Sequence, residues 1–202
     1  MTNREALRFG PLGPNALHLC IDMQHLFAEG PWETPWMHRV LPLVTALAEA
    51  APDRTVFTRF IPPERPEDAQ GSWRRYYESW SQMTRQALPA QALDLLPPLA
   101  RLVPPAAVLD KGTYSPWTEP ALDQLLAERG VDTVVISGAE TDVCVLAAVM
   151  GAVDRGYRVV VPVDAICSSS DRTHDALLTL YRERFGRQVE AVSADVILAE
   201  WR

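Results

Sequence analysis

The sequence has 202 residues, of which 48% are hydrophobic and 22% are charged, and its formal net charge is −7. This composition is typical of a folded globular protein and excludes the disordered, collagen-like and disulfide-scaffold classes. An acidic chain without a basic run is not expected to bind nucleic acid or an anionic membrane surface.

Proline clusters separate short β-branched runs from longer stretches with helical spacing, and the two kinds alternate along the chain. Six strands are predicted, in chain order, at Ala16–Ile21, Thr55–Phe60, Ala107–Leu109, Val131–Ile136, Tyr157–Val163 and Gln188–Val192. Six helices are predicted at Trp36–Ala50, Ser72–Leu88, Glu119–Arg129, Asp142–Arg155, Asp171–Arg184 and Ala194–Trp201. This alternation predicts an α/β fold, a three-layer sandwich with a mainly parallel six-stranded sheet and helices on both faces. The length is that of one large domain, so we expect a single domain over residues 1–202.

The expected localisation is cytoplasmic, without a membrane span. The longest apolar run, Val143–Val153, is about half of the roughly 20 residues that cross a bilayer. Residues 1–17 carry early charges and no apolar stretch of the kind found in a signal peptide. Three cysteines form an odd and sparse set, which favours reduced thiols.

Reactive side chains follow three of the predicted strands. Asp22 comes directly after the first strand, Lys111 follows the third, and Cys144 lies beyond the fourth. In an open parallel sheet, the ligand crevice lies outside the carboxyl ends of the strands. A carboxylate beside a thiol could accept its proton, and a lysine could stabilise the resulting thiolate. Taken singly, each residue has a plainer interpretation: a turn-capping aspartate, a solvated lysine and a small buried residue.

Cys144 is predicted to lie in the first turn of a helix, at the third helical position if Thr141 is the N-cap. There the helix dipole favours an anion, so we expect the pKa of the thiol to be lowered. The backbone N–H groups of this turn could also stabilise an oxyanion. Cys167 follows the fifth strand and is a rival nucleophile. Its neighbour Ser170 indicates a helix cap, which favours a structural role for Cys167.

Ordered motifs extend over nearly the whole chain: Ile21-Asp22-Met23-Gln24-x-x-Phe27, Lys111-x-x-Tyr114-Ser115-x-Trp117, Gly138-Ala139-Glu140-Thr141-Asp142-Val143-Cys144-Val145, Gly156-Tyr157-x-Val159, Asp164-Ala165 and Ser170-x-x-x-His174. In this order and spacing they resemble the isochorismatase-like cysteine hydrolases, which include nicotinamidases and N-carbamoylsarcosine amidohydrolases. The resemblance implies a catalytic triad of Asp22, Lys111 and Cys144. It also implies a cis peptide between Ala139 and Glu140 that directs the backbone N–H groups of Glu140 and Cys144 at an oxyanion. Relatives are often oligomeric, so a homodimer or homotetramer is expected.

The sequence departs from some members of this family. Metal-dependent nicotinamidases carry an Asp-x-His motif and a further histidine after the second strand, whereas no histidine occurs here between His38 and His174. We therefore expect no metal and no other cofactor, and nicotinamidase activity is less favoured. Isochorismatases themselves lack the nucleophilic cysteine, so Cys144 argues against cleavage of a vinyl ether.

Residues close to the motifs are expected to contact the substrate: Gln24, Phe27, Trp73, Tyr114 and Trp117. Trp117 stands where the family usually has phenylalanine, a change expected to reshape the pocket wall. Trp73 belongs to an aromatic stripe that includes Tyr76, Tyr77 and Trp80 at helical spacing. Such a stripe is typical of a core or a subunit interface, and the alternative is a lid over the pocket.

These residues together predict a cysteine-dependent amidohydrolase that cleaves the C–N bond of a small carboxamide, carbamoyl or ureido compound. The reaction would pass through a thioester and release ammonia or an amine. The alternative is a non-catalytic small-molecule-binding or assembly protein on the same scaffold. The motifs do not distinguish among these amide and ureido substrates.

Overall fold

The computed structural model describes residues 6–201, so the first five residues of the predicted N-terminal segment lie outside the described range. Its centre is a parallel sheet with the strand order β3-β2-β1-β4-β5-β7, and a short strand, β6, pairs with β4. The strands are β1 (Ala16–Ile21), β2 (Thr55–Phe60), β3 (Ala107–Lys111), β4 (Thr133–Ala139), β5 (Arg158–Pro162), β6 (Ile166–Cys167) and β7 (Val189–Val192). The bounds of β1 and β2 are those predicted, and β6, with only two residues, is additional to the six predicted strands.

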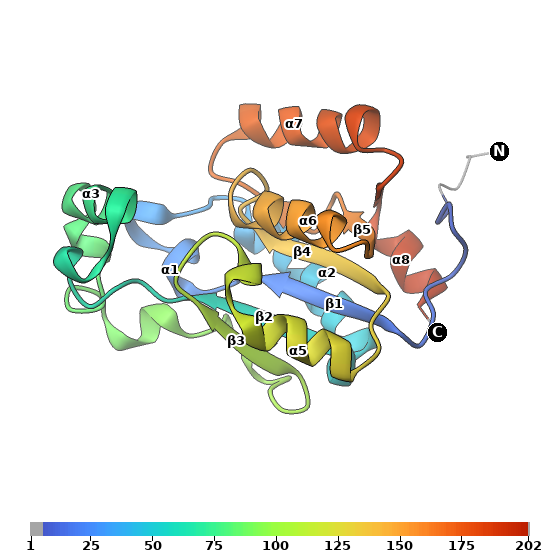
Figure 1. The fold of residues 1–202 in the computed structure, drawn as a ribbon, viewed down its shortest axis with the longest axis horizontal. Helices are drawn as coiled ribbons and strands as arrows, with labels where there is room; N and C mark the ends of the chain where they lie inside the picture. Colours follow the sequence, from blue (N-terminus) through green and yellow to red (C-terminus); the bar gives the residue numbers. More distant parts are fainter. Residues whose placement is uncertain (1–5, 202) are drawn as a thin grey trace.

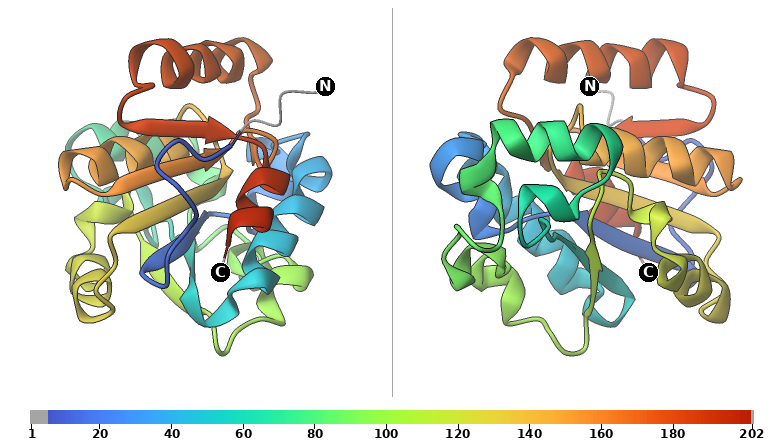
Figure 2. Two further views of the ribbon diagram at one scale, coloured as in Figure 1. Left: turned by 90° about the vertical axis from the view of Figure 1, so that its right-hand side faces the viewer. Right: turned by 60° about the vertical axis from the view of Figure 1, so that its left-hand side comes forward.

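Helices cover both faces of this sheet (Figure 2). They are α1 (His25–Ala28), α2 (Met37–Ala50), α3 (Gly71–Ser79), α4 (Pro97–Ala100), α5 (Pro120–Glu128), α6 (Cys144–Asp154), α7 (Asp171–Thr179) and α8 (Ala194–Glu200). Side chains of α2 and α8 pack in one hydrophobic cluster, and those of α5, α6 and α7 pack in a second. The predicted α/β sandwich is therefore confirmed, with one strand more than expected.

The central strands are buried on both faces, which explains their continuous apolar sequence. In β1, every residue is buried. Leu19 and Ile21 pack toward the cluster of α5 and α6, while Cys20 packs toward the cluster of α2. This alternation is the two-residue period of a strand applied to two apolar layers.

Two of the predicted helices end early. The stretch predicted as one helix from Ser72 to Leu88 forms α3 only to Ser79, after which Trp80 leaves helical geometry and a 3-10 turn follows at Ser81–Met83. The stretch from Asp171 to Arg184 changes from α-helix to a π-helical turn at Leu180–Arg184. No helix among residues 6–201 has the length and apolar character needed to cross a bilayer.

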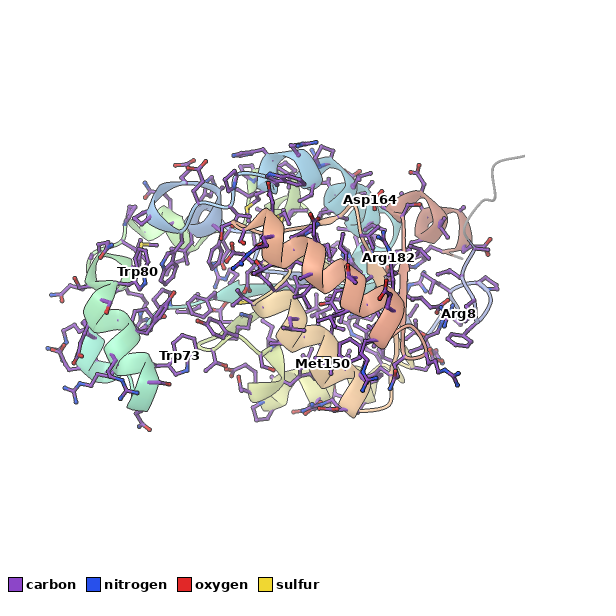
Figure 3. All side chains as sticks on the ribbon, turned by 90° about the horizontal axis from the view of Figure 1, so that it is seen from above. Arg8, Trp73, Trp80, Met150, Asp164 and Arg182 are labelled. Carbon is purple, nitrogen blue, oxygen red and sulfur yellow. The ribbon has the colours of Figure 1, made fainter. Side chains whose placement is uncertain are left out.

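The chain order of the strands places a crevice at one end of the sheet. From β1 the chain adds β2 and β3 on one side and then returns to add β4 on the other, so β1 and β4 flank the point where the order reverses. Ligands of open parallel sheets bind at the carboxyl ends of the strands at such a point. In Figure 1, β1 and β4 point toward the end that carries α1 and α3, whereas α8 lies at the opposite end. Trp73 and Trp80 mark this end in Figure 3, far from Arg8.

Candidate active site

A buried ion pair joins β1 to the end of β3. The Nζ of Lys111 lies 2.6 Å from Oδ2 of Asp22 and also donates to the carbonyl oxygen of Thr113 at 3.0 Å. The other carboxylate oxygen of Asp22 accepts a hydrogen bond from the Thr58 hydroxyl at 2.5 Å. Asp22 is 0% and Lys111 1% exposed, so each charge depends on the other for compensation.

The backbone around Asp22 is specialised. Asp22 has a φ of +50°, in the left-handed region that aspartate adopts more readily than most residues. Its N–H donates to Oγ1 of Thr58 at 3.1 Å, which fixes the turn against β2. On the other side, Gly138 of β4 has a φ of +105°, and a Cβ there would lie only 2.2 Å from the carbonyl oxygen of Ile21. The absence of a side chain at Gly138 therefore allows β4 to approach β1 closely at the residue before Asp22.

Cys144 is the first residue of α6, so the predicted cap at Thr141 is wrong. The Thr141 hydroxyl instead forms a 2.8 Å hydrogen bond with Nδ1 of His174, and Val143 is the N-cap without a side-chain cap bond. The carbonyl oxygen of Glu140 accepts from the N–H groups of Val143 and Val145. The Cys144 N–H lies between them, at a helical position that has no intrahelical acceptor.

The expectation that the thiol pKa is lowered is also wrong. Burial, and next the Asp22 carboxylate, raise the pKa of Cys144 well above its ordinary value, and Lys111 offsets this only in part. Burial by itself would lower the pKa of Lys111, but Asp22 and the Cys144 thiol outweigh it, so the pKa of Lys111 is raised. The helix terminus alone does not decide the protonation state, because the thiol is buried beside a carboxylate. The raised pKa favours the protonated thiol form of Cys144 in the free site.

Asp22→Asn is expected to increase the rate at which iodoacetamide alkylates Cys144 at pH 7 by about tenfold or more, because each unit of pKa changes the thiolate fraction tenfold. The substitution removes the anion that raises the pKa of the thiol and leaves Lys111 to pair with the thiolate. In the wild type, alkylation is expected to increase only as the pH rises above the ordinary range of a thiol.

Peptide mass spectrometry can follow this labelling at each cysteine separately. Cys20 and Cys167 are 0% exposed and serve as internal controls that label only on unfolding. A rate for Asp22→Asn at or below that of the wild type would show that Asp22 does not act on the thiol.

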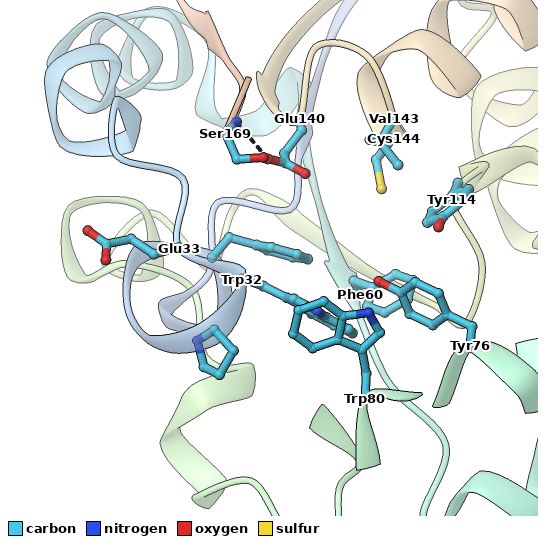
Figure 4. A pocket seen from close by; sticks show the side chains of 12 residues that line it. Trp32, Glu33, Phe60, Tyr76, Trp80, Tyr114, Glu140, Val143, Cys144 and Ser169 are labelled. Atoms are coloured by element: carbon cyan, nitrogen blue, oxygen red, sulfur yellow. Dashed lines mark hydrogen bonds between the residues drawn. The ribbon is translucent and has the colours of Figure 1, made fainter. Parts of the chain in front are cut away.

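The segment between β4 and α6 shapes the other wall of the site. The peptide bond between Ala139 and Glu140 is cis. Oε1 of Glu140 accepts hydrogen bonds from the Ser169 N–H at 2.8 Å and from the Thr34 hydroxyl at 3.2 Å. These two contacts fix the Glu140 carboxylate on the side of the site opposite Tyr114 (Figure 4).

Cys144 opens into a cavity of about 420 Å³, a volume that suits a small ligand. The cavity is lined mainly by aromatic rings, and the Cys144 sulfur points into it (Figure 4). The lining residues are Phe27, Pro31, Trp32, Glu33, Phe60, Tyr76, Trp80, Tyr114, Glu140, Val143, Cys144 and Ser169. Of the five predicted substrate contacts, Phe27 and Tyr114 line this cavity.

The structure places two of the predicted substrate contacts elsewhere. Gln24 is 0% exposed, and its amide bonds to the backbone of Phe60 and Leu93, so it ties the segment after β1 to β2. The indole of Trp117 donates to the carbonyl oxygen of Ala148 in α6 at 2.8 Å and stacks on Tyr157. Nearness in sequence to Asp22 and Lys111 did not indicate which way these side chains point.

The aromatic stripe divides between the core and the cavity. Tyr77 is 1% exposed, whereas Tyr76 and Trp80 line the cavity. Trp73 does not line it but packs edge-on against Tyr114, with ring centroids 4.7 Å apart. Trp80 reaches the cavity because α3 ends at Ser79. The predicted core role therefore fits Tyr77, while Tyr76 and Trp80 form part of the cavity wall; a lid and a subunit interface stay predictions.

Several functional candidates escaped the sequence analysis. Trp32 is the last residue of a short 3-10 turn at Gly30–Trp32, and Phe60 is the last residue of β2. The position of Phe60 at a strand end could have indicated it by the same rule that indicated Asp22.

Among residues 6–201, no group of three or more His, Cys, Asp or Glu side chains could hold a metal ion.

Comparison with known proteins places this geometry in context. Residues 16–192 match a family model described as the isochorismatase domain. The chain is 31% identical over 81 residues to an isochorismatase family protein of Bacillus subtilis and 32% identical over 79 residues to the maleamate amidohydrolase of Pseudomonas putida. These matches cover 40% and 39% of this chain, and the chain spans only 44% and 37% of the two relatives.

Solved structures extend the likeness over the whole fold. A cysteine hydrolase from Pseudomonas syringae superposes with a TM-score of 0.80 at 22% identity, covering 98% of each chain. N-carbamoylsarcosine amidase from Thermoplasma acidophilum superposes with a TM-score of 0.71 at 22% identity, covering 90% of this chain and 97% of that one. At this level of identity, the superpositions establish a shared fold.

Proposed function

Because the chain belongs to the isochorismatase family, we propose that it is a cysteine-dependent amidohydrolase that cleaves the C–N bond of a small carboxamide, carbamoyl or ureido compound. The observation that carries the proposal is the Cys144 thiol, which opens into the aromatic cavity while interacting with the buried Asp22–Lys111 pair. Amidohydrolases among the relatives, such as the maleamate enzyme, support the reaction class.

The first half of the reaction transfers the acyl group to Cys144. Asp22 accepts the thiol proton, and the Sγ electron pair forms a bond to the carbonyl carbon of the substrate. Lys111 compensates the negative charge on whichever of the two groups carries it, because it contacts Asp22 directly and also interacts with the thiol. The tetrahedral oxyanion receives hydrogen bonds from the N–H groups of Glu140 and Cys144.

The second half of the reaction restores the enzyme. The C–N bond breaks as Asp22 returns its proton to the leaving nitrogen, which departs as ammonia or an amine. Asp22 then accepts a proton from water as the water oxygen attacks the thioester, and the C–S bond breaks to regenerate the protonated thiol and release the acid. Each proton that Asp22 takes is given back, so one water is consumed and no other reagent is needed.

Cys144→Ala is expected to lower ammonia release by about 10⁴-fold or more, because it removes the nucleophile and leaves only binding and polarisation of the carbonyl. The assay uses primary carboxamides, N-carbamoyl compounds and ureido compounds as substrates. Cys167→Ala is the matched control, since Cys167 is a buried thiol near the site that the mechanism does not use.

Three results would be decisive. Release by the wild type and Cys167→Ala, with an acyl adduct on Cys144 in acid-quenched samples, supports the mechanism. Equal release by Cys144→Ala excludes Cys144 as the nucleophile. Failure of the wild type to release ammonia or amine from all three substrate classes contradicts the amidohydrolase assignment.

A further inference from the structure

The cavity above Cys144 is walled by rings that face one another from different segments. Trp32 is central to this group: its ring centroid lies 5.8 Å from that of Tyr76 and 6.1 Å from those of Trp80, Phe60 and Phe27. Distances of this size are those of packed aromatic pairs. The faces of such rings carry partial negative charge, so an enclosed group of them attracts cations.

The ionised groups that line the cavity are also negative. Two of its lining residues, Glu33 and Glu140, carry carboxylates. Among the described residues that line it, none is Lys, Arg or His. The Glu140 carboxylate is fixed by hydrogen bonds from Ser169 and Thr34, whereas the Glu33 carboxylate points away from the rings (Figure 4). Lys111, whose Nζ lies 5.0 Å from the centroid of the Phe60 ring, is 1% exposed and already bound to Asp22.

This charge distribution bears on the acyl part of the substrate. An amide that carries a carboxylate would bring a second negative charge beside Glu140, in a cavity whose lining offers no cation to pair with it. An amide that carries a cation would lose contacts with water on binding. In return, its cation would interact with the faces of the rings and with the negative charge of Glu140. The rings lie across the cavity from the Cys144–Glu140 side, so they would hold the end of the molecule remote from the reacting carbonyl (Figure 4).

We infer that the substrate is a cationic amide, with an ammonium or quaternary ammonium group seated among Trp32, Tyr76 and Trp80 and its carbonyl at Cys144. The inference rests on the proposed function, which places the amide carbonyl at Cys144. It adds that the substrate carries a positive charge, which the cavity selects. Trp32, Tyr76 and Trp80 determine specificity in this arrangement, and Glu140 adds a counter-charge through its side chain.

The test compares three acetamide-type ligands by isothermal titration of the Cys144→Ala protein, which binds without turnover. Trimethylammonioacetamide and 3,3-dimethylbutanamide have the same shape and differ in a single charge, and succinamate adds a carboxylate. We expect the cation to bind about tenfold more tightly than its neutral isostere, and succinamate to bind most weakly. A neutral isostere that binds as tightly as the cation, or succinamate as the tightest ligand, would overturn the inference.

Variants in the Cys144→Ala background locate the selectivity. Trp80→Leu keeps an apolar side chain but removes the ring, so the cation-to-neutral affinity ratio is expected to fall severalfold, whereas Trp80→Phe retains most of it. Glu140→Gln keeps an acceptor for Ser169 and Thr34 while removing the charge, and it is expected to lower the same ratio and its dependence on salt. Affinity for the neutral isostere reports any general damage to the cavity. An unchanged ratio in both Trp80→Leu and Glu140→Gln would exclude these residues as the source of selectivity.

Turnover by the wild-type protein separates this inference from the proposed function. Preferential binding of the cation without ammonia release from any amide would keep the cation site and reject the amidohydrolase. Ammonia release without a preference for the cation in Cys144→Ala would keep the enzyme and reject the cation site.

Discussion

Lys111→Met is expected to lower the free energy of unfolding by about 3–5 kcal/mol and to abolish activity, because it leaves the Asp22 carboxylate buried without a counter-charge. Combining it with Asp22→Asn is expected to recover most of that stability, since two neutral side chains can occupy a buried ion-pair site at little net cost. The asparagine also still accepts from the Thr58 hydroxyl. Activity is expected to remain absent in the double variant, because no group accepts the thiol proton.

Urea unfolding followed by circular dichroism measures the stability of each variant. The matched control is Arg59→Met, because Arg59 of β2 and Asp110 of β3 also form an ion pair at 2.7 Å, next to Lys111 in the same edge strand, but lie partly in solvent. That substitution is expected to cost about 1 kcal/mol or less. If Lys111→Met were no more damaging than Arg59→Met, burial would not be what makes the Asp22–Lys111 pair indispensable.

Gly138→Ala is expected to destabilise the protein by more than about 3 kcal/mol, or to prevent folding. Two causes act together: the φ of +105° is unfavourable for alanine, and the new Cβ would lie 2.2 Å from the Ile21 carbonyl oxygen and 2.8 Å from its nitrogen. Backbone atoms cannot rotate away as a side chain can. Relief of the clash must therefore separate β4 from β1 at the residue before Asp22.

Gly156→Ala separates these two causes. Gly156 also has a positive φ, +79°, but nothing lies within 4 Å of the position that a Cβ would take. Its substitution is expected to cost about 1–2 kcal/mol from backbone strain alone. Thermal unfolding of both variants gives the comparison, and equal losses would show that β1 and β4 can move apart without penalty.

The reactive residues at or beyond the strand ends were predictable, because strand periodicity and the rule for open sheets both depend on local sequence. Asp22, Lys111 and Cys144 are brought to one site as those patterns indicated. The cap of α6 was not predictable, because Thr141 bonds to His174, which lies 33 residues further along the chain. A long-range hydrogen bond here overrides a local capping preference.

The cavity wall was also beyond the sequence. Trp80 faces the cavity only because α3 ends before it, and Trp32 does so from a 3-10 turn between helices. Trp117 and Gln24 differ from them, because both belong to the sequence motifs but do not line the cavity. Trp117 packs against α6, and Gln24 bonds to β2. Side-chain direction at such positions depends on tertiary packing, which the spacing of residues does not encode.

Strand β3 holds Lys111 and is the edge of the sheet, paired with β2 alone among the described strands. Edge strands open by local fluctuation more readily than central ones, because fewer hydrogen bonds must break. Of the residues proposed for proton transfer and nucleophilic attack, Asp22 directly follows the central strand β1 and Cys144 begins the helix after the central strand β4, whereas their counter-charge, Lys111, lies in the edge strand. We therefore expect local opening of this short edge strand to disrupt the site before the fold as a whole is lost.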